Sequence, residues 1–173
     1  MVIEPHDVLW LLPFGALLGQ DQIPVGEKWA LLHTPSQETM EEIRKENPRW
    51  NRNEFTGLIL ANPVVSKDTR KDPRFRDSMA VPLESAEREA KILAGFFPRN
   101  RQNYYIREQA DREKLIAATN VAVIHLATHG TALPEDPLAS SLLLANKSKS
   151  GVFTAREAMD LKLTADLVTL SAC

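Results

Sequence analysis

The stretches AVIHLATHG, residues 122–130, and DLVTLSAC, residues 166–173, decide the fold. Each is an apolar run that ends in small residues and one reactive side chain, His129 in the first and Cys173, the only cysteine, in the second. Nearly continuous apolar runs are typical of parallel strands that are covered on both faces. We therefore expect both stretches to be central strands of one sheet.

Strand-like and helical segments alternate through the rest of the chain. TGLILANP (56–63) and QNYYI (102–106) have the composition of strands. VPLESAEREAKILAGFF (81–97) repeats apolar residues every three or four positions, as an amphipathic helix does, and TAREAMDLKL (154–163) is a second helical segment. The alternation predicts an α/β fold in a single domain over residues 1–173, with a largely parallel sheet and helices on both faces.

The composition excludes several classes of function. Lys+Arg 21 against Asp+Glu 23 gives a net charge of -2, so a nucleic-acid partner or an anionic membrane has no electrostatic support. One cysteine allows no internal disulfide, and no apolar run approaches the roughly 18 residues that span a bilayer, so we expect a cytoplasmic protein. The seven glycines form no phosphate-binding loop, and we expect no cofactor. Three charged or polar runs are expected on the surface: 44–54, 66–77 and 146–151.

The placement of His129 and Cys173 suits nucleophilic catalysis. Carboxyl ends of parallel strands meet at one rim of a sheet, and neighbouring strands lie about 4.8 Å apart. An imidazole there can accept the proton of a thiol, and the thiolate is a strong nucleophile. The N–H groups of Gly130 and Cys173 are candidate donors to an oxyanion. The alternative is that Cys173 is a small buried apolar residue and that His129 makes only local hydrogen bonds.

Other interpretations of the polar residues are weaker. His125 and His129 have a spacing that binds zinc on a helix, but an extended strand would separate them by about 13 Å, so we expect no metal and a buried His125. Asp136 either forms a pocket for a basic substrate side chain or caps the turn before Pro137. The chain has no Gly-x-Ser-x-Gly motif, so an α/β-hydrolase mechanism has no support.

Five motifs, in the same order along the chain, resemble those of the CHAT family of caspase-like domains, in the caspase–separase group of cysteine peptidases. They are VIEPHDVLWLLPFGAL, VPLESAEREAKILAGFF, HLATHG, DPLASSLLLA and the final LVTLSAC. The resemblance implies a caspase-like three-layer sandwich and a cysteine endopeptidase that hydrolyses peptide bonds of proteins through a thioester. It makes His129 the general base and Cys173 the nucleophile, with the backbone N–H groups of Gly130 and Cys173 in the oxyanion hole.

The resemblance also sets expectations about context. Family members are commonly joined to tetratricopeptide or other sensor modules and act in bacterial signalling or defence. Their domains have further sequence before the first strand and after the cysteine, so we expect a fragment, truncated at both ends and lacking its C-terminal strands. Such a fragment would have little protease activity and would tend to self-associate. The alternative function is a non-catalytic CHAT-type scaffold or regulatory interaction module.

Overall fold

The computed structural model describes residues 1–46, 56–66, 69, 81–146 and 150–172. Most of the predicted surface run at 44–54, nearly all of that at 66–77 and the middle of the one at 146–151 lie outside this part of the chain, and so does Cys173. The chain divides into two compact units, residues 1–50 and 51–173. The prediction of a single domain over 1–173 stays a prediction.

In its described residues the first unit has a short sheet and two α-helices, the second of which is α2 (Gln37–Glu46). Strand β1 (Val2–Ile3) pairs in parallel with β2 (Leu32–His33). Helix α2 begins where the Ser36 hydroxyl accepts the N–H of Thr39 at 3.0 Å, which satisfies a backbone donor of its first turn. The remaining elements are 3₁₀ helices at Asp7–Leu11 and Phe14–Ala16, α1 (Val25–Lys28) and α2 (Gln37–Glu46).

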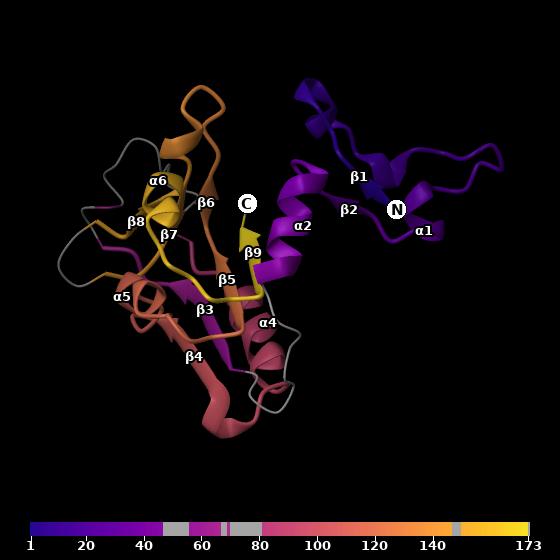
Figure 1. The fold of residues 1–173 in the computed structure, drawn as a ribbon. Coiled ribbons are helices and arrows are strands. Elements are labelled where there is room, and N and C mark those ends of the chain that lie inside the picture. The colour runs from indigo at the N-terminus through magenta and orange to yellow at the C-terminus, as the bar shows by residue number, and fades with distance from the viewer. Residues whose placement is uncertain (47–55, 67–68, 70–80, 147–149, 173) are drawn as a thin grey trace. The chain divides into compact units, whose positions relative to one another are not determined.

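A four-stranded parallel sheet organises the second unit (Figure 1). Its strand order is β4-β3-β5-β9, and each neighbouring pair is parallel. This confirms the predicted α/β class with a parallel sheet. The strands are β3 (Gly57–Pro63), β4 (Gln102–Arg107), β5 (Val123–Thr128) and β9 (Leu167–Ala172), and the helices are α4 (Glu84–Ala94), a 3₁₀ helix at Arg99–Arg101, α5 (Arg112–Ile116) and α6 (Ala155–Met159).

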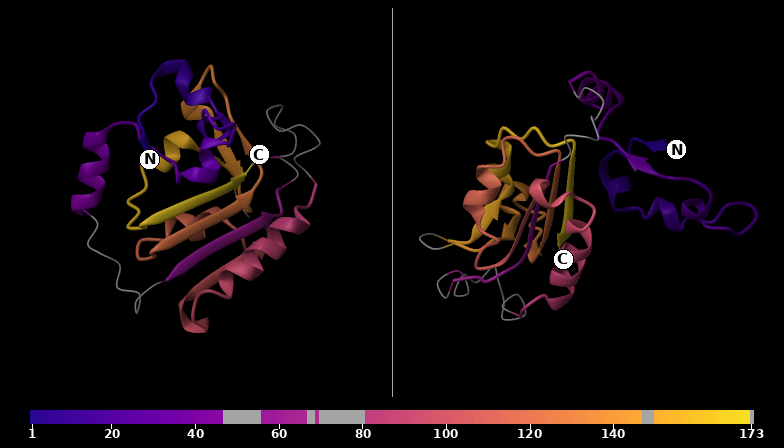
Figure 2. Two further views of the ribbon diagram at one scale, coloured as in Figure 1. Left: turned by 90° about the vertical axis from the view of Figure 1, so that its right-hand side faces the viewer. Right: turned by 90° about the horizontal axis from the view of Figure 1, so that it is seen from below.

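Helices cover both faces of this sheet, as Figure 2 shows. On one face Ile59, Ala61 and Ala127 pack against the alanines of α4, whose small side chains let the helix lie close to the strands. On the other face alternate residues of β3 and β5 pack with Leu115 of α5 and with Phe153. Because successive strand residues point to opposite faces, one apolar run in β3 or β5 fills both layers of the core.

A second sheet continues from the end of β5. It is antiparallel, with the order β6-β7-β8, and only His129 separates β5 from β6. His129 therefore lies at the junction of the two sheets. The elements of this part are β6 (Gly130–Thr131), a 3₁₀ helix at Pro137–Ala139, β7 (Ser141–Leu143) and β8 (Val152–Thr154).

Strand β9 corrects one prediction. Its sequence predicted a central strand covered on both faces, but β9 is an edge strand, whereas β5 lies inside the sheet and is buried. Leu167, Val168 and Leu170 are exposed by 47%, 44% and 58%. Apolar composition predicts which residues prefer to be covered, and it does not specify which residues cover them. Within the described part of the chain, no helix has the length and apolarity needed to cross a bilayer.

Candidate active site

The backbone of His129 is fixed from two sides. Its carbonyl accepts the N–H of Leu143 at 2.9 Å, which joins it to β7. The preceding residue, Thr128, is buried and donates its hydroxyl to the carbonyl of the same Leu143. These two bonds continue the pairing of β6 with β7 back to the end of β5 and leave little freedom at His129.

The ring of His129 has a defined partner. Its Nε2 lies 3.0 Å from the carbonyl oxygen of Val81. A carbonyl can only accept a hydrogen bond, so Nε2 carries the proton and, in the neutral ring, Nδ1 is an acceptor. The sequence analysis missed Val81, because the contact uses a backbone carbonyl 48 residues away and no side-chain motif marks it.

The pairing of β5 with β9 brings together the two residues that precede His129 and Cys173 in the sequence. Six residue pairs run in parallel from Val123 with Leu167 to Thr128 with Ala172. His129 follows Thr128 in the sequence, and Cys173 follows Ala172. Cys173 itself lies outside the described residues, so the dyad and the oxyanion donors stay predictions.

Gly130 lies where the two sheets approach each other closely. A Cβ atom at this position would be 3.2 Å from Cδ2 of Leu142 and 3.3 Å from Cβ of Ala172. Both separations are tighter than ordinary van der Waals contacts. Glycine therefore lets β6 pass next to the last described residue of β9.

Glu89 on α4 contacts side chains of both β5 and β9 on one face of the sheet. His125 is 5% exposed, which confirms the prediction of a buried strand histidine. Its Nε2 lies 2.9 Å from Oε1 of Glu89, but without hydrogen-bond alignment, so the contact is a close electrostatic approach. Oε2 of Glu89 accepts the hydroxyl of Ser171 at 3.2 Å. The side chains of His125 and Ser171 therefore both face α4.

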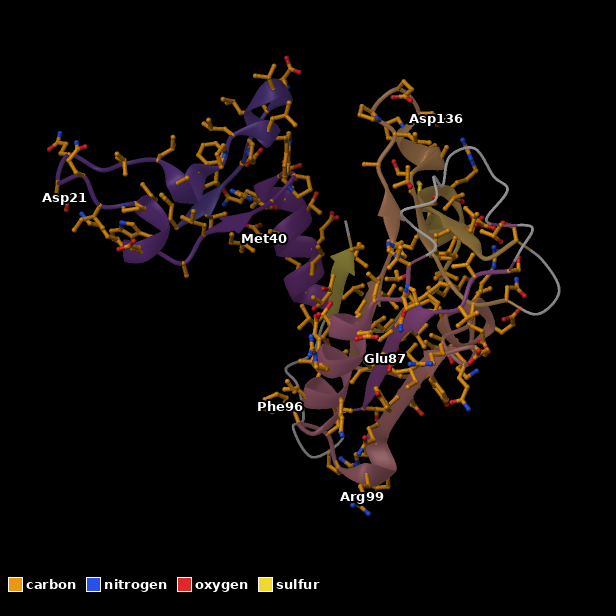
Figure 3. All side chains as sticks on the ribbon, turned by 180° about the vertical axis from the view of Figure 1, so that it is seen from behind. Asp21, Met40, Glu87, Phe96, Arg99 and Asp136 are labelled. Atoms are coloured by element: carbon orange, nitrogen blue, oxygen red, sulfur yellow. The ribbon has the colours of Figure 1, made fainter. Side chains whose placement is uncertain are left out.

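Three polar side chains meet at the ends of β3 and β4, next to the start of α4. The amide of Asn62 accepts the N–H of Leu83 at 2.7 Å and donates to Oε1 of Glu87 at 2.7 Å. Arg107 donates from Nε to the same Oε1 at 2.7 Å. Hydrogen bonds from Arg107, and then from Asn62, hold the pKa of Glu87 below its usual value. Glu87 is therefore an ionised acceptor at neutral pH; it is labelled in Figure 3.

The comparison with protein families agrees with this arrangement. A family model described as the CHAT domain matches residues 1–173, the whole chain. The chain belongs to the CHAT domain family. This confirms the resemblance drawn from the sequence motifs, and the family is caspase-like and related to peptidases. None of the curated proteins compared matches the chain.

A metal site and a capping role for Asp136 have no supporting contacts in the described part of this CHAT domain. Among the described residues, no group of three or more His, Cys, Asp or Glu side chains is placed to hold a metal ion. Asp136 precedes the 3₁₀ helix at Pro137–Ala139, and its side chain makes no capping hydrogen bond, so the proposed cap is wrong. Figure 3 shows Asp136 on the loop that follows β6.

The CHAT domain also has an apolar pocket of about 510 Å³ on the face of the sheet opposite α4. Gly130 and Ala172 form part of its wall. Its other walls come from β5, β9, α6 and the second sheet, with Leu126, Leu142, Phe153 and Leu161 among them. Ile124 and Leu126 of β5 also line it, and their side chains alternate with that of His125, so the pocket and the contact of His125 with Glu89 lie on different faces of the sheet.

Proposed function

We propose that the rim formed by the ends of β5 and β9 is the active site of a caspase-like cysteine endopeptidase. His129 is the general base and Cys173 the nucleophile. The observation that carries the proposal is the parallel register, which pairs Thr128 with Ala172, the residues that precede the dyad. Adjacent parallel strands lie about 4.8 Å apart, and side chains that follow paired residues are therefore within reach of one another.

The faces of the strands support the same conclusion. The His129 ring bonds to Val81, three residues before α4 begins, and Ser171 bonds to Glu89 on α4. Strand side chains alternate between faces, so Cys173, two positions after Ser171, belongs by alternation to the α4 side. The proposed base and nucleophile then share one side of the sheet.

The chemistry follows from the orientation of the imidazole. Nδ1 of His129 accepts the thiol proton of Cys173 while Nε2 keeps its bond to Val81. The sulfur then bonds to the carbonyl carbon of a peptide, and the oxyanion is stabilised by the N–H groups of Gly130 and Cys173. As the C–N bond breaks, the imidazolium gives its proton to the leaving amine. A water molecule, deprotonated by His129, then hydrolyses the thioester and releases the thiol.

Alkylation of the thiol tests the proposal without a known substrate. A cysteine with no base titrates near pH 8.5, and a neighbouring histidine keeps it reactive at lower pH. We expect iodoacetamide to modify Cys173 at pH 6.5, with a rate that falls about tenfold or more in His129→Ala. His6→Ala, a change at an exposed histidine of the other unit, is the matched control and should leave the rate unchanged.

Equal alkylation rates in the wild-type protein and His129→Ala would contradict the dyad and favour the non-catalytic scaffold. If the dyad is present, any cleavage of a peptide library should be unchanged in His6→Ala and lost in Cys173→Ala. The proposed substrates are proteins. The sensor modules that the family resemblance implies stay a prediction.

A further inference from the structure

We propose that Asn62 is a positioning residue for His129, acting together with Glu87 and Arg107. These three residues are called the Asn62 cluster below. The cluster holds the chain at Val81–Leu83 so that the Val81 carbonyl keeps its hydrogen bond to the His129 ring. The effect on the imidazole stands on the described contacts, and only its consequence for catalysis rests on the proposed function.

The contacts form a continuous path. Asn62 accepts the N–H of Leu83, and Val81, two residues earlier, accepts the Nε2–H of His129. Pro82 lies between them and restricts its own φ and the backbone of the residue before it. A bond that fixes Leu83 therefore limits where the Val81 carbonyl can point.

Burial makes the bonds of Asn62 necessary. Asn62 is 5% exposed, so its amide cannot exchange these partners for water without cost. Its NH₂ group donates to Glu87, and the Arg107 guanidinium bonds to the same carboxylate oxygen. The charged pair thereby fixes the orientation of the amide, with its oxygen toward Leu83 and its nitrogen toward Glu87.

The backbone at the cluster is itself unusual. Asn62 and Arg107 have φ values of 46° and 53°, in the left-handed region. The register between β3 and β4 shifts between Ala61 and Pro63, next to Asn62. Asparagine adopts this region more readily than most residues, whereas arginine does not. Such conformations persist where surrounding contacts over-determine them.

A simpler role for Asn62 is to satisfy a backbone N–H at the start of α4. That role predicts a change in stability and none in the environment of His129. The positioning role predicts that the bond from His129 to Val81 loosens when the cluster is disrupted, even under conditions where the domain stays folded. A signal from the imidazole N–H itself distinguishes the two.

The experiment measures hydrogen exchange at Nε2–H of His129 by NMR on ¹⁵N-labelled protein. We expect exchange to accelerate about fivefold or more in Asn62→Ala, as for the loss of one net hydrogen bond. Glu87→Ala should have a smaller effect, and Glu87→Gln the smallest, because the glutamine oxygen can still accept from Asn62. Glu157→Ala is the matched control. It also removes a glutamate that pairs with an arginine: Glu157 of α6 lies 2.6 Å from Arg112 of α5, outside the Asn62 cluster.

Wild-type exchange in a folded Asn62→Ala variant would overturn the proposal. So would an equal acceleration in Glu157→Ala, because the effect would then be general destabilisation. If Asn62→Ala does not fold, the two Glu87 variants decide: acceleration in Glu87→Ala with rescue in Glu87→Gln supports positioning, and equal exchange in both overturns it. Thiol alkylation that is insensitive to His129→Ala would refute the peptidase proposal and leave the exchange result standing.

Discussion

Replacing Gly130 by alanine tests whether the close approach of β6 to β9 controls the rim. The added Cβ would lie 3.2 Å from Leu142 Cδ2 and 3.3 Å from Ala172 Cβ, so each neighbour must move by a few tenths of an ångström. Alanine keeps the backbone N–H, so the proposed oxyanion donor remains. Any loss of reactivity then reports displacement of the end of β9.

The expected cost in stability is small. Overpacking costs about 1–3 kcal/mol, and the lower end applies because Leu142 and Ala172 offer side-chain atoms that can yield. No glycine among the described residues has a positive φ, so alanine fits the backbone of Gly130. It also stabilises by about 0.5 kcal/mol through the unfolded chain. The net loss in free energy of unfolding should be about 0.5 kcal/mol.

Gly57→Ala is the matched control at the opposite end of the sheet. Its Cβ would meet three ring carbons of Phe97 at 2.6, 2.7 and 2.9 Å, and Phe97 is only 8% exposed. The ring has to move within the core, so the upper end of the overpacking range applies. After the same gain from the unfolded chain, the net loss should be about 2.5 kcal/mol.

The two variants should therefore have opposite profiles. Urea denaturation should show the larger loss of stability in Gly57→Ala. Alkylation of Cys173 at pH 6.5 should slow about threefold to tenfold in Gly130→Ala and stay unchanged in Gly57→Ala, since small displacements at a reacting pair cost rate. An alkylation rate in Gly130→Ala equal to that of the wild-type protein would refute this account of the rim. A larger loss of stability in Gly130→Ala than in Gly57→Ala would refute it as well.

Two other predictions concern charge and exposure. Because the pKa of Glu87 is lowered in the folded protein, ionised Glu87 stabilises the fold at pH values above its ordinary pKa near 4.5. This contribution is lost as the pH falls through the lower pKa of the folded state. Urea denaturation should show that the free energy of unfolding falls less between pH 7 and pH 3.5 in Glu87→Gln than in wild type; equal falls would contradict this. Leu170→Lys, at a side chain 58% exposed on edge strand β9, should reduce self-association in sedimentation velocity, with an unfolding free energy within about 0.5 kcal/mol of wild type. Unchanged sedimentation would contradict it.

Local sequence patterns are sufficient to predict the parallel sheet. The runs at β3, β5 and β9 are short and apolar, and the segment of α4 repeats its small residues at helical spacing. These patterns depend on residues close in the chain, so they are visible without coordinates. They also place His129 at a strand end, as the structure shows.

The partners of His129 could not be predicted in the same way. Val81 contributes a carbonyl, which every residue has, and Asn62 acts through the N–H of Leu83. Neither contact depends on a spacing in the sequence. They arise from the packing of α4 and the residues before it on the sheet, which brings residue 83 to residue 62 and residue 81 to residue 129. The sequence analysis missed the exposure of β9 for a related reason. Composition indicates that its residues prefer burial, and it does not indicate which residues, if any, pack against them.

The register of β9 is the condition on which the proposed dyad depends. A slip of one residue would turn the side chain of Ser171 away from α4 to the opposite face, because strand side chains alternate. The hydrogen bond from Ser171 to Glu89 is compatible with only one of these two alternations. The approach of Gly130 to Ala172 selects the same alignment, because the small pair fits only when these residues meet. Ser171 and Ala172 thus specify the alignment on which the proposed dyad depends, and neither needs a role in the chemistry.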